Sequence, residues 1–290
     1  MRSLWGSDAE AVETLQEACG YFLTTDTRQQ KIFMLVGPKR SGKGTIARVL
    51  VALLGRSNVG GPTLGSLATN FGLAPLITKP LAIISDARLS GRSDQAVIVE
   101  RLLSISGEDV LTVDRKHREP WTGTLPTRFL LLSNELPRLA DASGAMASRF
   151  VMLTLKMSFY GREDPRLTEK LRADLPGILR WCLEGLRRLQ ERGRFIQPAS
   201  SAEAIRELED LGSPVGAFIR DRCELEPGLE ITCDHLYDAW KTWCEEQGWK
   251  RASTRQSFGR DLRATAPGIV TTQRREGSAR VRMYEGIALR

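Results

Sequence analysis

The amino-acid sequence predicts an α/β fold with a helical segment at its beginning and a small winged helix at its end. Short apolar runs typical of strands buried on both faces recur between residues 32 and 155. The first run leads through a glycine-rich loop into a helical pattern. Residues 202–290 combine helical patterns with a hairpin pattern. These three observations define a core and two flanking parts.

The size and composition of the chain fit this division. Its 290 residues have room for one large domain and a smaller one, and the 41% hydrophobic and 27% charged content is ordinary for a globular protein. No apolar run approaches the roughly 18–20 residues that span a bilayer, and the beginning lacks the pattern of a secretory signal. We therefore expect a cytoplasmic chain without a membrane partner. Its parts would be a helical, collar-like region at 1–30, the core at 31–195 and a winged-helix-like domain at 202–290.

A helix precedes the core, which begins with a strand–loop–helix unit. Residues 8–23 carry apolar side chains at the 3–4 spacing of an amphipathic helix. Residues 32–36 form an apolar run that ends at a glycine, as a buried strand would. Residues 46–54 then predict a helix that Gly55 ends. This order is the context that a phosphate-binding loop needs.

Three further strands are predicted at 81–85, 129–133 and 150–155. Asp86 follows the first of them and Asn134 the second. Ligands of open α/β sheets bind outside the carboxyl ends of the strands, so both side chains are expected at the binding edge.

The rest of the chain predicts helices, a linker and a hairpin. A helical region at 165–193 completes the core and 197–201 is a linker. The last domain is predicted to contain helices at 214–223, 232–247 and 253–264 and hairpin strands at 269–273 and 280–284.

Positive charge concentrates at the end of the chain. The net charge is +7, and residues 251–290 contain nine arginines, no lysine and three acidic residues. Such a stretch is a candidate nucleic-acid surface. The five cysteines are scattered and form no CxxC pair, which favours buried thiols over a disulfide framework or a zinc ribbon.

The glycine-rich loop fits the phosphate-binding pattern GxxxxGK. Its members are Gly37, Pro38, Lys39, Arg40, Ser41, Gly42, Lys43, Gly44 and Thr45. Backbone N–H groups of such a loop surround the phosphates of ATP, Lys43 reaches the terminal ones, and the following helix adds its positive end. The usual pattern has Ser or Thr directly after the lysine to hold Mg²⁺. Gly44 stands there, so Thr45 is the candidate metal ligand.

Three residues downstream are candidates for hydrolysis. Asp86 is placed to hold Mg²⁺ through water and to orient the attacking water; a helix-cap or turn role is the alternative. A second acid such as Glu108 could assist it. Asn134 could hold a water or a γ-phosphate oxygen. Arg149 precedes the last strand, where it could project into a neighbouring subunit and stabilise the transition state in trans.

Residues 107–121 suggest a strand that runs into a basic tip. Arg115, Lys116 and His117 form this tip, which could hold a phosphate backbone. A solvated loop is the alternative.

In the order and spacing of these motifs the chain resembles the superfamily 3 helicases, most closely the D5-like helicase portion of phage and plasmid primase-helicases. The resemblance implies an AAA+-like P-loop NTPase core. It equates the tip at Lys116 and His117 with the DNA-contacting hairpin of the ring's pore. It makes Asn134 sensor 1 and Arg149 the arginine finger. The family usually carries Glu or paired acids at the position of Asp86.

What the resemblance implies for function is an ATP- and Mg²⁺-dependent DNA helicase. It would form a homo-oligomer, a hexameric ring, around single-stranded or forked DNA and move 3′ to 5′. Residues 214–267 resemble the winged-helix tail of such proteins, and a primase would be supplied by another chain or a missing N-terminal part. Two other functions stay open: a small-molecule kinase with an adenylate-kinase-like loop, and a DNA-binding replication initiator that uses ATP as a switch without unwinding.

Overall fold

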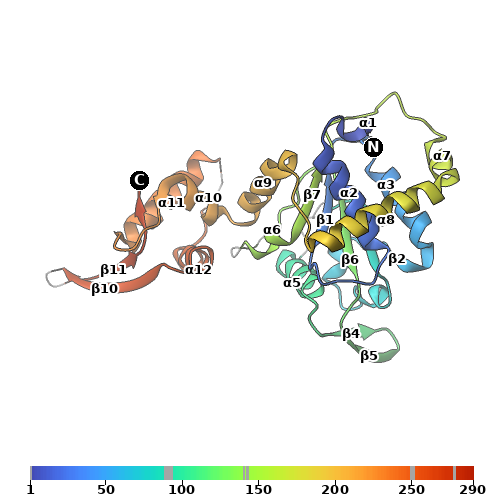
Figure 1. The fold of residues 1–290 in the computed structure, drawn as a ribbon. Coiled ribbons are helices and arrows are strands. Elements are labelled where there is room, and N and C mark those ends of the chain that lie inside the picture. The colour runs from blue at the N-terminus through green and yellow to red at the C-terminus, as the bar shows by residue number, and fades with distance from the viewer. Residues whose placement is uncertain (1, 88–93, 140, 142–143, 249–251, 277–278) are drawn as a thin grey trace. The chain divides into compact units, whose positions relative to one another are not determined.

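The computed structural model describes residues 2–87, 94–139, 141, 144–248, 252–276 and 279–290. The chain divides into two compact units (Figure 1). The first contains Met1–Leu139 and Met146–Leu208, and the second contains Ala140–Ala145 and Glu209–Arg290.

The first unit is built on a five-stranded sheet in which every pairing is parallel. In spatial order the strands are β2 (Val59–Gly60), β3 (Leu81–Ile84), β6 (Arg128–Ser133), β1 (Ile32–Val36) and β7 (Phe150–Thr154). The mixed α/β fold with a parallel sheet is thus confirmed. The order places β1 between β6 and β7, so the loop after β1 lies beside the ends of both neighbours.

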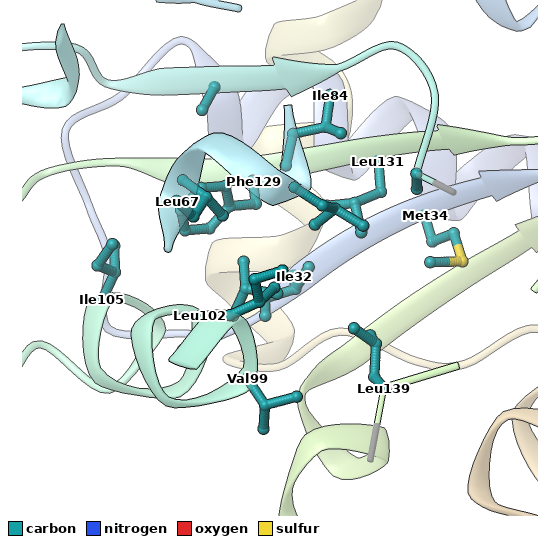
Figure 2. Close-up of a cluster of buried hydrophobic side chains, with 14 of the residues drawn as sticks. Ile32, Met34, Leu67, Ile84, Val99, Leu102, Ile105, Phe129, Leu131 and Leu139 are labelled. Carbon is teal, nitrogen blue, oxygen red and sulfur yellow. The ribbon is translucent and has the colours of Figure 1, made fainter. Parts of the chain in front are cut away.

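The position of β1 in the sheet explains why its sequence shows no alternation of apolar and polar residues. Ile32, Met34 and Val36 lie in one hydrophobic cluster, whereas Phe33 and Leu35 lie in another. Successive side chains of a strand point to opposite faces, so the sheet has a core on each side. Figure 2 shows the first cluster, where Ile32 and Met34 lie among side chains of β3, β6 and α5 (Gln95–Ser106).

The opposite face of the sheet is covered by helices at positions that the sequence predicts. They are α2 (Ala9–Phe22), α3 (Lys43–Leu54) and α8 (Leu175–Arg192). The expected helical region at 165–193 is divided into α7 (Leu167–Ala173) and α8, where Pro176 occupies the first turn. Helix α3 begins at Lys43, three residues earlier than expected, so the lysine belongs to the first turn of the helix.

Helices α2 and α8 lie side by side and approach each other at glycines (Figure 1). A Cβ on Gly20 would collide with the carbonyl oxygen of Cys182, and a Cβ on Gly185 would collide with the backbone of Gln16. Beside this crossing the buried carboxylate of Glu17 accepts a 2.8 Å hydrogen bond from Arg188 Nε. The N-terminal helix is therefore fixed to a segment more than 150 residues away.

Arg128, the first residue of β6, joins the sheet to the chain that follows α2. Its buried guanidinium donates hydrogen bonds to the carbonyl oxygens of Tyr21 (2.8 Å), Thr24 (2.6 Å) and Pro80 (3.0 Å). Backbone carbonyls buried at this edge of the sheet thus obtain a charged donor.

The second unit contains the expected helices and hairpin. They are α10 (Pro214–Arg222), α11 (Cys233–Glu246) and α12 (Arg255–Thr265), with β10 (Val270–Glu276) and β11 (Ala279–Glu285). Strand β9 (Glu230–Thr232) adds a third antiparallel strand beside β11. The core of this unit is aromatic: Phe218 packs edge-on against Trp240, which stacks on Trp243 and Phe258.

Most of the remaining elements are short. They are α1 (Arg2–Trp5), α4 (Leu64–Leu67), α6 (Ala145–Arg149), α9 (Ala202–Gly212), β4 (Leu111–Arg115), β5 (Arg118–Gly123), β8 (Cys223–Glu224), β12 (Ala288–Leu289) and the 3-10 turns η1 (Arg56–Asn58), η2 (Ala74–Leu76) and η3 (Ala199–Ser201). All five cysteines are buried thiols. In the part of the chain that the structure describes, no helix has the length and apolar character to cross a bilayer.

Candidate functional site

The glycine-rich loop connects β1 to α3 at the carboxyl edge of the sheet. Its first residue, Gly37, donates a hydrogen bond to the Ser133 carbonyl at 3.2 Å, and a Cβ there would collide with the carbonyl oxygen of Leu155. Gly42 caps α3 with a φ of 95°, in the left-handed region that glycine adopts without a Cβ penalty. Both glycines are required by the backbone path of the loop.

Lys43 is folded back into the loop, and its side chain is buried. Its Nζ donates hydrogen bonds to the carbonyls of Gly37 (2.6 Å) and Pro38 (2.8 Å), to Ser41 Oγ (3.1 Å) and to Asn134 Oδ1 (3.1 Å). Burial lowers the pKa of Lys43 from its ordinary value. The structure thus brings together two residues that the sequence singles out 91 positions apart.

Asp86 lies at the same carboxyl edge, two residues past the end of β3. The next residue, Ala87, donates to the Leu132 carbonyl at 3.1 Å, so this segment runs beside the end of β6. The Asp86 side chain is exposed. Within the described residues no group of three or more His, Cys, Asp or Glu gathers as a metal site. A Mg²⁺ ion at this edge would depend on Asp86, Thr45 and phosphate oxygens, since magnesium commonly binds through one or two carboxylates and substrate phosphates.

Thr45 lies in the first turn of α3, and its hydroxyl accepts a 3.0 Å hydrogen bond from Arg48 Nη2. Arg48 also donates through Nε to Thr168 Oγ1 of α7 at 3.2 Å. Sequence reasoning did not single out Arg48. Its position three residues after Thr45, on the same helix face, is the signal that could have found it.

The chain that follows β7 covers the outer side of the loop. Ser158 Oγ donates to the Lys39 carbonyl at 2.8 Å, and the Phe159 N–H donates to the Arg40 carbonyl at 3.0 Å. The Arg40 guanidinium also pairs with Glu163 at 3.4 Å. Sequence reasoning missed this covering segment, because polar contacts between two irregular segments leave no periodic pattern.

Arg149 lies at the opposite, amino-terminal edge of the sheet, where α6 meets β7. Its Nη1 donates to Gln30 Oε1 at 2.9 Å and to the Ser106 carbonyl at 3.3 Å. A five-residue strand such as β7 spans about 16 Å, which separates this edge from the loop of the same chain. Nearby, Lys31 donates to the Ser148 carbonyl at 2.7 Å, and burial together with the charge of Arg149 lowers the pKa of Lys31.

Glu108 lies at this amino-terminal edge as well, which corrects one hypothesis. Its carboxylate accepts hydrogen bonds from the Thr27 hydroxyl and from Gln30 Nε2. Both partners precede β1, whereas Asp86 follows β3 at the other edge. The idea that Glu108 assists Asp86 within one chain is therefore wrong.

The basic tip is the turn of a β-hairpin. Strands β4 and β5 pair from Leu111 with Gly123 to Arg115 with Arg118, so Lys116 and His117 form a two-residue turn. His117 has a φ of 57°, in the left-handed region that such a turn uses. Both tip side chains are exposed, and Val113 anchors the hairpin in the core.

Comparison with known families identifies two segments of the chain. Residues 35–149 match the family described as a family of unknown function, DUF5906. Residues 213–276 match the family described as poxvirus D5 protein-like. The first match contains the loop and Arg149, and the second lies in the C-terminal unit.

Solved structures share the fold of this chain. The apo structure of the NrS-1 C-terminal region (305–718) has a TM-score of 0.62 and 12% identity, with 99% of this chain and 74% of that chain covered. An A-form apo structure of the same region has a TM-score of 0.59 and 13% identity over 98% of this chain and 74% of that chain. A JCV helicase structure also matches, with a TM-score of 0.37 and 19% identity over 72% of this chain and 63% of that chain. The expected resemblance to the D5-like group of superfamily 3 helicases is confirmed at residues 213–276, which match the family described as poxvirus D5 protein-like.

Proposed function

We propose that the chain is the ATP-hydrolysing motor of a DNA helicase of the primase-helicase type. The observation that carries the proposal is the placement of three predicted site residues at opposite edges of one sheet. Lys43 and Asn134 meet at the carboxyl edge, and Arg149 lies about 16 Å away at the amino-terminal edge. A single subunit would bind ATP with the first pair and offer the arginine to its neighbour.

At the carboxyl edge the loop would bind the phosphates of ATP. Lys43 would exchange loop carbonyls for phosphate oxygens, with the positive end of α3 beside it. Asp86 and Thr45 would hold Mg²⁺, which would supply positive charge to the leaving phosphate. Asn134 would hold the attacking water or a γ-phosphate oxygen. These parts are those of an AAA+-like P-loop NTPase core.

At the amino-terminal edge Arg149 would complete the active site of a second copy. Phosphoryl transfer gains about 10³–10⁵ in rate from an arginine supplied in this way. A closed ring, which we propose to be a hexamer, would give every subunit one such neighbour.

DNA would be bound by two separate basic elements. The first is the hairpin tip with Arg115, Lys116 and His117, which would contact a phosphate backbone in the pore of the ring. The second is the C-terminal unit, whose three helices and basic β10–β11 hairpin we propose to be a winged helix. The ring would track single-stranded or forked DNA, and a separate primase would make the primers.

The test is ATP hydrolysis with and without forked DNA, followed by strand separation on the same fork. We expect DNA to stimulate hydrolysis by the purified chain and ATP to drive unwinding. Asp86→Asn should bind ATP but abolish both activities. Turnover that DNA does not change would favour the small-molecule kinase, and ATP-dependent DNA binding without turnover would favour the replication initiator.

A further inference from the structure

We infer that Arg48 is a phosphate-binding residue of the nucleotide site, and that its guanidinium stands where the loop lacks a metal-binding hydroxyl. The inference rests on the proposed function, because it needs a nucleotide in the loop. It adds a cation that follows the lysine by five positions, outside the GxxxxGK pattern.

The geometry turns Arg48 toward the loop. Its Nη2 donates to Thr45 Oγ1 at 3.0 Å, and its Nη1 lies 3.5 Å from where a Cβ on Gly44 would stand. Helical side chains lean toward the N-terminus of their helix, so an arginine one turn into α3 reaches the phosphate end. Gly44 leaves open the space that the guanidinium approaches.

The charges around Arg48 favour binding of an anion. The first turn of α3 contains no acidic residue, and its cap, Gly42, offers no side-chain oxygen. Lys43 and the positive end of the helix already lie there, so a further cation is unfavourable until negative charge arrives. Among the described residues no carboxylate pairs with Arg48, whereas Arg40 of the same loop has Glu163.

The partners of Arg48 hold it in place without neutralising it. Thr168 of α7 accepts from Nε at 3.2 Å, and Thr45 accepts from Nη2. A guanidinium has five N–H donors in a rigid fork. Three of them, two on Nη1 and one on Nη2, are left for phosphate oxygens.

This arrangement has a consequence for metal dependence. A loop with Ser or Thr at the position of Gly44 brings positive charge to the phosphates through Mg²⁺. Here the guanidinium of Arg48 supplies fixed positive charge at the first turn of α3. Nucleotide binding should therefore survive removal of Mg²⁺, and under that condition Arg48 should matter most.

The experiment measures binding of ADP and ATP to the full chain by calorimetry, once with Mg²⁺ and once with EDTA. Without Mg²⁺, Arg48→Gln should weaken binding about tenfold or more, since it removes charged hydrogen bonds. The loss should be smaller with Mg²⁺. Arg48→Lys keeps the charge but loses the fork of donors, so its affinity for nucleotide should lie between those of the wild type and Arg48→Gln. Arg56→Gln removes the same charge from an exposed site just past α3 and should bind like the wild type.

Thr168→Val tests whether Arg48 acts by binding phosphate or only by linking α3 to α7. It removes one anchor of Arg48 but no cation, and it should change affinity far less than Arg48→Gln. A loss in Arg48→Gln that is equal with and without Mg²⁺, or no loss, would overturn the inference. If Arg48→Gln fails to fold, unchanged affinity of Arg48→Lys in EDTA would overturn it. Failure of the wild type to bind nucleotide even with Mg²⁺ would instead overturn the proposed function, whereas failure in EDTA alone would overturn the inference.

Discussion

At the scale of single residues, the charged groups of the core differ in what holds them. Lys43 is held by carbonyl, hydroxyl and amide oxygens that a phosphate can replace, whereas the buried side chain of Arg128 is held by backbone carbonyls that join the sheet to the end of α2 and the chain after it. The first residue is therefore suited to binding and the second to stability. Substitution should separate these two roles.

Lys43→Ala should reduce ATP binding at least about a hundredfold, since it removes a charged donor to the terminal phosphates. Calorimetry measures this. The fold should stay intact, because among the described residues the ammonium donates hydrogen bonds only to the loop and to Asn134. Unchanged affinity would show that the loop does not bind the phosphates.

Arg128→Met should lower the free energy of unfolding by about 3–5 kcal/mol, because buried carbonyls lose their charged donor. Urea titration followed by circular dichroism measures it. The exposed Arg180, which forms an i,i+4 pair with Glu184, is the control, and Arg180→Met should cost about 0.5 kcal/mol or less. Equal losses would mean that the Arg128 contacts contribute no more than a surface pair.

At the scale of elements, the α2–α8 pair and the β4–β5 hairpin differ in how closely they pack against the rest of the unit. The helices meet backbone to backbone at Gly20 and Gly185, so neither can gain volume there. The hairpin is anchored through Val113 and exposes its tip. Small substitutions at the α2–α8 contact should therefore lower stability, whereas substitutions at the tip of the β4–β5 hairpin should change function.

Gly20→Ala should destabilise the first unit by about 1–3 kcal/mol, since an added methyl group must push two helices apart. Thermal unfolding measures it. Gly61 has open space around its Cβ position, so Gly61→Ala should be neutral or slightly stabilising. A neutral Gly20→Ala would mean that the two helices shift apart at little cost.

The hairpin tip should matter for unwinding more than for hydrolysis. Lys116→Gln with His117→Asn removes two of the three basic groups of the tip, and Asn tolerates the left-handed backbone of His117. We expect strand separation to fall at least about tenfold, as phosphate contacts are lost, with ATP turnover in the absence of DNA unchanged. Equal loss of both would indicate a folding defect.

At the scale of the whole molecule, the proposed active site needs two copies. Lys43→Ala subunits lack the loop lysine, and Arg149→Ala subunits lack the arginine for a neighbour. Each variant alone should be inactive, but mixed assemblies should regain part of the ATPase activity, because some interfaces pair an intact loop with an intact arginine. No recovery in assemblies shown to be mixed would contradict action in trans.

Features that burial determines could be predicted from the sequence. Features that depend on contacts between distant segments mostly could not. Strand 32–36 is predicted to the residue because both of its faces are buried. The meeting of Lys43 and Asn134 follows from the rule that ligands bind at the carboxyl ends of strands. Short strands such as β8 and β9 show no period to detect. The spacing of Arg48 from Thr45 can be read from the sequence, whereas its hydrogen bond to Thr168 of α7 cannot, because the two residues lie 120 positions apart.

The position of β1 in the sheet also governs how the chain can fold during synthesis. Both strands that pair with β1 lie far along the chain, β6 at 128–133 and β7 at 150–154. The two strands that flank the loop are therefore not both present until more than 150 residues have been made. Until β7 has been made, at least one edge of the apolar strand β1 is unpaired, and such an edge invites pairing with other chains. A fragment that stops before β7 should aggregate, whereas one that continues through α8 contains every strand and helix that frames the loop.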